Sequence, residues 1–127
     1  MSRAITARGE DYLKSIYRLQ EERKVVRVKD LAAVMEVKAP TVVGILTSLK
    51  EQGLVQQEPY GYLVLSTEGE RLARELLDKE ELLRDFFFRV LKMDPEQAED
   101  NSCAIEHYVT PEGYDRFQVF LRFLNQC

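Results

Sequence analysis

The sequence contains no long hydrophobic run, only 4 prolines and only 2 cysteines. No apolar stretch approaches the roughly 20 residues that a membrane-spanning helix needs. With 45% hydrophobic residues, the composition is also unlike that of a disordered tail. Cys103 and Cys127 lack CxxC spacing, which argues against a disulfide framework and a structural zinc ribbon. We therefore expect a globular cytoplasmic protein with no membrane partner.

A chain of 127 residues has the size of one ordinary domain, or of a small DNA-binding module joined to a second helical unit. Its charge is unevenly divided. Residues 1–66 contain 10 Lys and Arg against 8 Asp and Glu, whereas residues 67–127 contain 8 against 14. The mildly basic first half can meet phosphate and the acidic second half can attract cations, although a solvated acidic face is the simpler explanation of the latter.

Hydrophobic spacing predicts three helices in the first half, over residues 6–22, 29–37 and 41–52. Pro40 suits the first turn of the third helix and Gly53 suits its end. Two short helices separated by a tight turn are typical of a helix-turn-helix. Two β-prone runs follow within residues 54–66 and predict a hairpin. A hairpin directly after the recognition helix is the wing of a winged helix-turn-helix.

The second half predicts three further helices, over residues 67–91, 94–109 and from 110 onward. Thr67 and Glu70 are spaced as a capping box for the first of these. The predicted fold is therefore mainly α, with a winged helix-turn-helix and two-stranded wing in residues 1–69 and a helical module in residues 70–127.

Metal-ligand residue types recur along the expected helix at residues 94–109. Glu99, Cys103 and Glu106 are spaced i, i+4 and i+7, and His107 follows Cys103 by four residues. Each has an ordinary structural explanation, since a single cysteine is usually a small core residue and a single histidine a satisfied polar one. One helix cannot complete a coordination shell, so we expect another ligand from the pair Glu10 and Asp11.

Four segments resemble the diphtheria toxin repressor family of iron and manganese regulators. They are EDYLKSIYRL from Glu10, VKDLAAVMEVKAPTVVGILTSLKEQGLV from Val28, LVLSTEG ending at Gly69, and CAIEHYVT from Cys103. The resemblance covers nearly the whole chain and implies a homodimeric, metal-dependent repressor of metal-uptake genes. It also implies that the helical module binds metal and dimerises. The length corresponds to the short members, without the SH3-like domain.

The resemblance places the primary metal ligands at Asp11, Cys103, Glu106 and His107. Thiolate, carboxylate and imidazole together suit borderline ions, so Fe(II) is favoured, with Mn(II), Co(II), Ni(II) or Zn(II) as alternatives. Lys14 replaces a second acidic ligand of the manganese regulators, and Cys103 replaces a bridging glutamate, so a binuclear manganese site is not expected.

A secondary site departs from the family pattern. Glu80 and Glu99 replace histidines there, and Arg84 replaces a carboxylate ligand of the iron-dependent members. Arg84 can pair with Glu80 at i, i+4 or with Glu99 across helices, which makes these residues a secondary metal site or a salt-bridge cluster. The alternative is an ordinary exposed Glu80–Arg84 pair.

The expected partner is a double-stranded DNA operator, read by the amino end of the third helix in the major groove. The residues expected to contact DNA are Arg27, Lys29, Lys38, Pro40, Thr41, Gly44, Lys50 and Tyr60. Gly44 is a departure, since iron-dependent members carry a glutamine there. The dimer contact is expected from the last three helices, whose aromatic residues exceed what so small a module buries: Phe86, Phe87, Phe117, Phe120 and Phe123.

Two other functions fit parts of the sequence. A winged-helix regulator that no longer depends on metal is supported by Lys14 and by the altered secondary site. An enzyme with Cys103 as nucleophile and His107 as base has suitable residue types. However, two residues one helical turn apart lie side by side, and no substrate pocket is evident. We therefore expect neither catalysis nor a small-molecule substrate.

Overall fold

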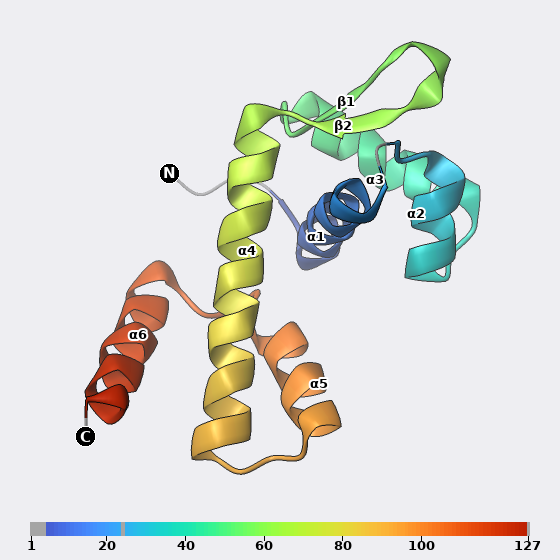
Figure 1. Cartoon of the computed structure of the whole chain (residues 1–127). Coiled ribbons are helices and arrows are strands. Elements are labelled where there is room, and N and C mark those ends of the chain that lie inside the picture. Colours follow the sequence, from blue (N-terminus) through green and yellow to red (C-terminus); the bar gives the residue numbers. More distant parts are fainter. Residues whose placement is uncertain (1–4, 24, 127) are drawn as a thin grey trace. The chain divides into compact units, whose positions relative to one another are not determined.

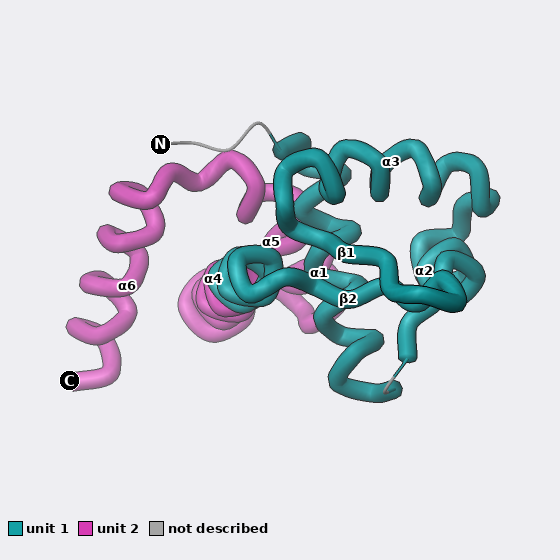
Figure 2. The backbone as a smooth tube through the Cα atoms, turned by 90° about the horizontal axis from the view of Figure 1, so that it is seen from above, with its two compact units in different colours: residues 1–75 teal, residues 76–127 magenta. Residues whose placement is uncertain are grey.

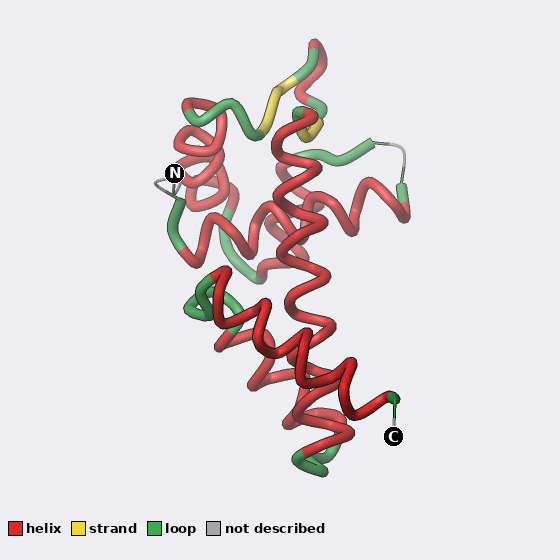
Figure 3. The backbone as a smooth tube through the Cα atoms, turned by 90° about the vertical axis from the view of Figure 1, so that its left-hand side faces the viewer, coloured by secondary structure: helices red, strands yellow, loops and turns green. Residues whose placement is uncertain are grey.

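The computed structural model describes residues 5–23 and 25–126 and has the expected mainly α architecture (Figure 1). Its elements are α1 (Ala7–Glu22), α2 (Val28–Met35), α3 (Ala39–Glu51), β1 (Val55–Gln57), the 3-10 turn η1 (Pro59–Gly61), β2 (Leu63–Leu65), α4 (Thr67–Asp85), the π-helical turn η2 (Phe86–Val90), α5 (Pro95–Ile105) and α6 (Pro111–Asn125). Among the residues that the structure describes, the two strands β1 and β2 form the wing and all other regular elements are helical (Figure 3). The winged-helix prediction is confirmed.

The chain divides into two compact units, Met1–Glu75 and Leu76–Cys127, within the continuous helix α4 (Figure 2). The division predicted at residue 69 stays a prediction. Within the described ranges no single helix is long and apolar enough to cross a membrane. Only α2 and α3, bent by 109° at their break, reach that length and composition as a pair.

The first unit is built on α1, whose first turn is capped by Thr6. The Thr6 Oγ1 accepts a hydrogen bond of 3.0 Å from the Gly9 N–H. One face of α1 enters a core shared with α2, α3, the wing and the start of α4, and burial of each large side chain contributes about 1.5–3 kcal/mol. The fully or almost fully buried members include Tyr12, Leu13, Ile16, Leu31, Val42, Leu46, Leu49, Leu54 and Leu63.

The helix-turn-helix has the local geometry that its sequence predicts. Glu36 adopts a left-handed conformation with φ of 56° and ends α2, two residues earlier than predicted at its far end. Lys38 is the N-cap of α3, and Pro40 lies in the first turn, where a missing N–H has no cost. The stripe Val42, Leu46 and Leu49 is buried, so the opposite face of α3 is exposed.

The wing is an antiparallel pair in which Val55 faces Leu65 and Gln57 faces Leu63. Its tip turns through Tyr60 and Gly61, both with positive φ. A bridge between Val26 and Leu63 attaches the segment before α2 to the start of β2.

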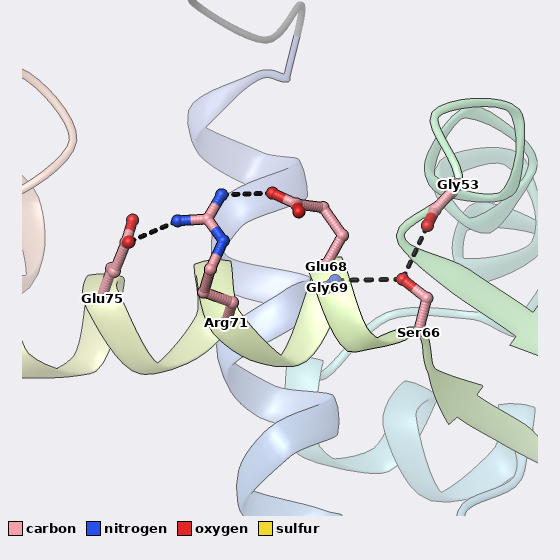
Figure 4. A network of polar contacts seen from close by, with 6 residues as sticks. All are labelled: Gly53, Ser66, Glu68, Gly69, Arg71 and Glu75. Carbon is pink, nitrogen blue, oxygen red and sulfur yellow. Dashed lines mark hydrogen bonds and ion pairs between the residues drawn. The ribbon is translucent and has the colours of Figure 1, made fainter.

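Ser66 connects the end of the recognition helix to the start of α4 (Figure 4). Its Oγ donates to the Gly53 carbonyl at 2.6 Å and accepts from the Gly69 N–H at 3.0 Å. Ser66 therefore caps α4, and the capping box expected from Thr67 is wrong by one residue. Along the exposed face, Arg71 pairs with Glu68 and Glu75.

The second unit contains the end of α4, η2, α5 and α6. Phe86 packs edge-on against Phe117, with ring centroids 5.2 Å apart, and also contacts Phe87 and Phe120. The helix α5 ends at Ile105, four residues before the predicted end. Thr110 then caps α6 by accepting from the Gly113 N–H at 3.0 Å. Cys127 lies outside the described residues.

Candidate metal and DNA-binding sites

Glu106 and His107 form a buried acid–imidazole pair at the end of α5. The Glu106 side chain is 0% exposed and that of His107 is 6% exposed, and His107 Nδ1 lies 3.4 Å from Glu106 Oε1. A carboxylate removed from water is stable only beside a cation or hydrogen-bond donors. The donor types of this pair therefore fit a divalent transition metal.

The backbone holds this pair in a turn. The Glu106 N–H donates to the Ser102 carbonyl at 3.1 Å, and the Tyr108 N–H donates to Ile105 at 2.9 Å. Lys79 on α4 donates to the Val109 carbonyl at 3.2 Å, which fixes the segment just after His107 against α4. His107 is thus positioned by the closing turn and not by a continuing helix.

Cys103 was expected to converge with Glu106 and His107, and the structure does not place its thiol in one ligand group with them. Cys103 lies on α5 and is half-buried. Within residues 5–23 and 25–126, no three-ligand group with all atoms within 4.8 Å of one another includes its thiol. The prediction that Cys103 and His107 converge assumed that both residues lie on one helix. Because α5 ends at Ile105, His107 lies beyond that helix.

Asp11 belongs to the first unit, whereas Glu106 and His107 belong to the second. Within α1, Asp11 lies one turn before Lys14, and the Lys14 Nζ is 3.4 Å from Asp11 Oδ1. The Lys14 side chain is 2% exposed and that of Asp11 is 37% exposed. Lys14 is thus a buried cation beside the expected ligand Asp11.

The secondary cluster contains an ion pair between helices. Arg84 on α4 donates to Glu99 on α5 at 2.9 Å, and both side chains are partly exposed. Glu80 is 1% exposed. The alternative of an ordinary exposed Glu80–Arg84 pair does not fit, because Glu80 is buried.

The predicted recognition residues lie on the exposed side of α3. Lys38, Pro40, Thr41 and Gly44 are all exposed. A Cβ added to Gly44 would meet no atom within 4 Å, so the surface of α3 is open at this point. Lys50, in the last turn, donates to the Gln57 Oε1 on β1 and thereby joins the recognition helix to the wing.

The remaining predicted DNA contacts lie outside α3. Arg27 occupies the N-cap position of α2, lies over the Tyr62 ring at 4.8 Å and donates to its hydroxyl at 3.2 Å. Lys29 is exposed on α2. Tyr60 is 90% exposed at the wing tip. The first unit therefore exposes two further predicted cations and the Tyr60 side chain on α2, on the segment before it and on the wing.

Sequence reasoning missed three exposed residues of α3: Val43, Thr47 and Ser48. The signal was available, since all three lie outside the buried stripe Val42, Leu46 and Leu49. It also missed Phe88, which is 46% exposed, while Phe86 and Phe117 pack on each other. Consecutive phenylalanines do not reveal which one the π-helical turn directs outward.

Comparison with known proteins assigns both halves of the chain. Residues 4–63 match the N-terminal DNA-binding domain of iron-dependent repressors, and residues 66–127 match their metal binding and dimerisation domain. The transcriptional regulator MntR of Escherichia coli O157:H7 is 34% identical over 87% of this chain and 71% of that protein. MntR of Bacillus subtilis strain 168 is 29% identical over 92% of this chain and 82% of that protein.

The solved structure of the manganese regulator SloR has a TM-score of 0.81 at 30% identity and covers 91% of this chain. This chain spans about half of that structure, 54% of its length. The two matched domains follow each other in the order that the winged unit and the helical unit have here. The chain therefore belongs to the iron-dependent repressor family, the family of the diphtheria toxin repressor, whose members are metal-dependent DNA-binding transcriptional regulators and not enzymes.

Proposed function

We propose that this protein is a homodimeric, cytoplasmic repressor of metal-uptake genes that binds its operator when a divalent metal ion is bound. The observation that carries the proposal is the buried Glu106–His107 pair, which lies inside the segment matched to a metal-binding domain. A carboxylate and an imidazole held together away from water form half of a coordination shell.

The proposed primary ligands are Asp11, Cys103, Glu106 and His107. A bound ion would supply positive charge that neutralises these carboxylates. Asp11 is the proposed switch residue, because it lies on α1 of the DNA-binding unit while the other ligands follow one another at the end of α5. Ligation by Asp11 would fix the two recognition helices of the dimer at a spacing suited to successive major grooves. Ligation by Cys103 would require its thiol to move closer to the ligand atoms of Glu106 and His107.

The metal preference is proposed as Fe(II). Imidazole and carboxylate together suit Fe(II), and a thiolate contribution from Cys103 would favour it over Mn(II). SloR is described as a manganese regulator, so Mn(II) is the main competitor. Metal analysis of protein purified without chelator tests this choice. About one equivalent of iron per subunit supports the proposal, and manganese in its place contradicts the Fe(II) preference.

For DNA recognition we propose that Pro40, Thr41 and Gly44 approach base edges while lysine and arginine side chains neutralise phosphates. Phosphate contacts give affinity and register, whereas base contacts give sequence preference. The proposed phosphate contacts are Arg27, Lys29, Lys38 and Lys50, with Tyr60 at the wing tip. Val43, half-exposed beside Gly44, adds an apolar contact suited to a thymine methyl group.

The proposed dimer contact is an apolar patch on the second unit. Its members, which are between 37% and 61% exposed, are Phe88, Leu91, Val119, Phe120, Phe123 and Leu124. An exposed group of this kind on a small unit marks an interaction surface. A second copy of the same patch would cover it in a symmetric dimer.

The proposed secondary cluster needs no metal. The Arg84 guanidinium already supplies positive charge to Glu99 across α4 and α5. A regulator that no longer depends on metal remains the second candidate, favoured by Lys14 beside Asp11. Operator binding that is unchanged by chelator would favour this second candidate.

A further inference from the structure

Lys14 is a buried cation on the helix that carries the proposed switch residue. Its side chain is 2% exposed, and its neighbours Leu13, Ser15 and Ile16 along α1 are buried as well. Lysine is almost never fully buried without a charged partner, because removal of its ammonium from water is costly. Here the ammonium lies 3.4 Å from Asp11 Oδ1.

The contact between Lys14 and Asp11 follows from their spacing. Residues three apart on a helix lie on the same face, so Lys14 reaches Asp11 without any rearrangement of α1. The Lys14 side chain is far less exposed than that of Asp11, which means that water screens the ammonium poorly. Interactions between charges strengthen as the surrounding dielectric falls.

We propose that Lys14 is a resident counter-ion that determines the affinity and the number of metal ions at the proposed site. This inference rests on the proposed function. In metal-free protein the ammonium stabilises the Asp11 carboxylate. When a divalent ion binds Asp11, the same ammonium repels it and lowers its affinity. A second ion beside Asp11 would meet that repulsion at closer range, so the site holds one ion per subunit.

The test measures Co(II) affinity by competition with a fluorescent chelator, and Co(II) stoichiometry by elemental analysis, on the full chain. Lys14→Met and Lys14→Gln remove the charge and keep most of the side-chain length. Two such variants are used so that the test stands if one of them does not fold. Lys14→Arg keeps the charge. Lys92→Met removes an exposed lysine of the second unit and is the matched control. Thermal unfolding followed by circular dichroism verifies that each variant is folded.

Lys14→Met or Lys14→Gln should bind Co(II) at least about tenfold more tightly than the wild type, while Lys14→Arg and Lys92→Met stay close to the wild type. Co(II) binding by a charge-neutral variant, with no detectable binding by the wild type, would also support the inference. Equal or weaker Co(II) binding by both folded charge-neutral variants overturns it, as does more than one bound Co(II) per subunit of the wild type. If no protein of the set binds Co(II), the proposed metal site itself fails, and the inference fails with it.

Discussion

Gly69, in the first turn of α4, lies against the backbone of Leu54 so closely that a Cβ at this position would lie 2.0 Å from the Leu54 carbonyl oxygen. Leu54 links the recognition helix to the wing, and Ser66 hydrogen-bonds both Gly53 and Gly69. The beginning of α4 is therefore fitted to the end of α3 through backbone atoms, which leaves little freedom for α3 to move against it.

Gly69→Ala should lower the free energy of unfolding by about 1–3 kcal/mol or more, because the added methyl group meets backbone and not a movable side chain. Urea denaturation measures the change. Gly44→Ala is the matched control, since its Cβ would meet nothing within 4 Å and alanine is the better helix former. That control should be stabilised by about 0.5–1 kcal/mol. Equal effects at the two positions would contradict the close approach at Leu54.

Arg84→Met should change the free energy of unfolding by less than about 1 kcal/mol, because both members of the Arg84–Glu99 pair are partly exposed and screened by water. Urea denaturation at low and high salt measures the contribution. A decrease well above about 2 kcal/mol would mean that the pair is buried and structural.

Metal titration of the wild-type protein should also leave Glu80 and Glu99 without a second ion.

Lys38→Glu or Lys50→Glu should weaken binding to an operator fragment selected with the wild-type protein. Each substitution removes a cation that neutralises phosphate, so the dependence of log affinity on log salt should become shallower by about 1 for each lysine replaced. Titration by fluorescence anisotropy at several salt concentrations measures both quantities. Arg116→Glu, an exposed reversal in the second unit, is the control and should have little effect. Unchanged affinity in both lysine variants would show that the recognition helix is misplaced.

Phe123→Glu should weaken the dimer, since its ring is 61% exposed in the apolar patch of the second unit. Sedimentation equilibrium at micromolar concentration should give a wild-type dimer and a variant shifted toward monomer. Val34→Glu, on a similarly exposed apolar residue of α2, is the control and should remain dimeric. A monomeric wild type would refute the proposed contact.

Local rules predicted the fold well where one segment decides its own structure. Pro40 indicated the first turn of α3, which begins two residues before the predicted start, and the two β-prone runs within residues 54–66 predicted both strands. The end of α5 was misjudged because residues beyond Ile105 have helical spacing, yet the turn at Tyr108 and the bond from Lys79 to Val109 draw the backbone away.

The candidate site was harder to predict because it depends on burial and on contacts between helices. Sequence identified Glu106 and His107 as ligand types but placed Cys103 with them on the assumption of a continuous helix. It treated Lys14 as a missing ligand, whereas burial makes Lys14 a cation paired with Asp11. Spacing permitted Arg84 to pair with either of two glutamates, and the contact with Glu99 across α4 and α5 becomes visible only in the structure.

The most direct test of the metal switch compares operator affinity in metal-loaded and chelator-treated protein, with wild type and Asp11→Ala measured side by side. Coupling between two sites is typically about 1–3 kcal/mol, so metal should raise the operator affinity of the wild type by roughly tenfold or more. Asp11→Ala should still bind some metal through the ligands at the end of α5, yet its operator affinity should no longer respond. Equal operator affinity of the loaded and metal-free wild type would contradict the metal switch.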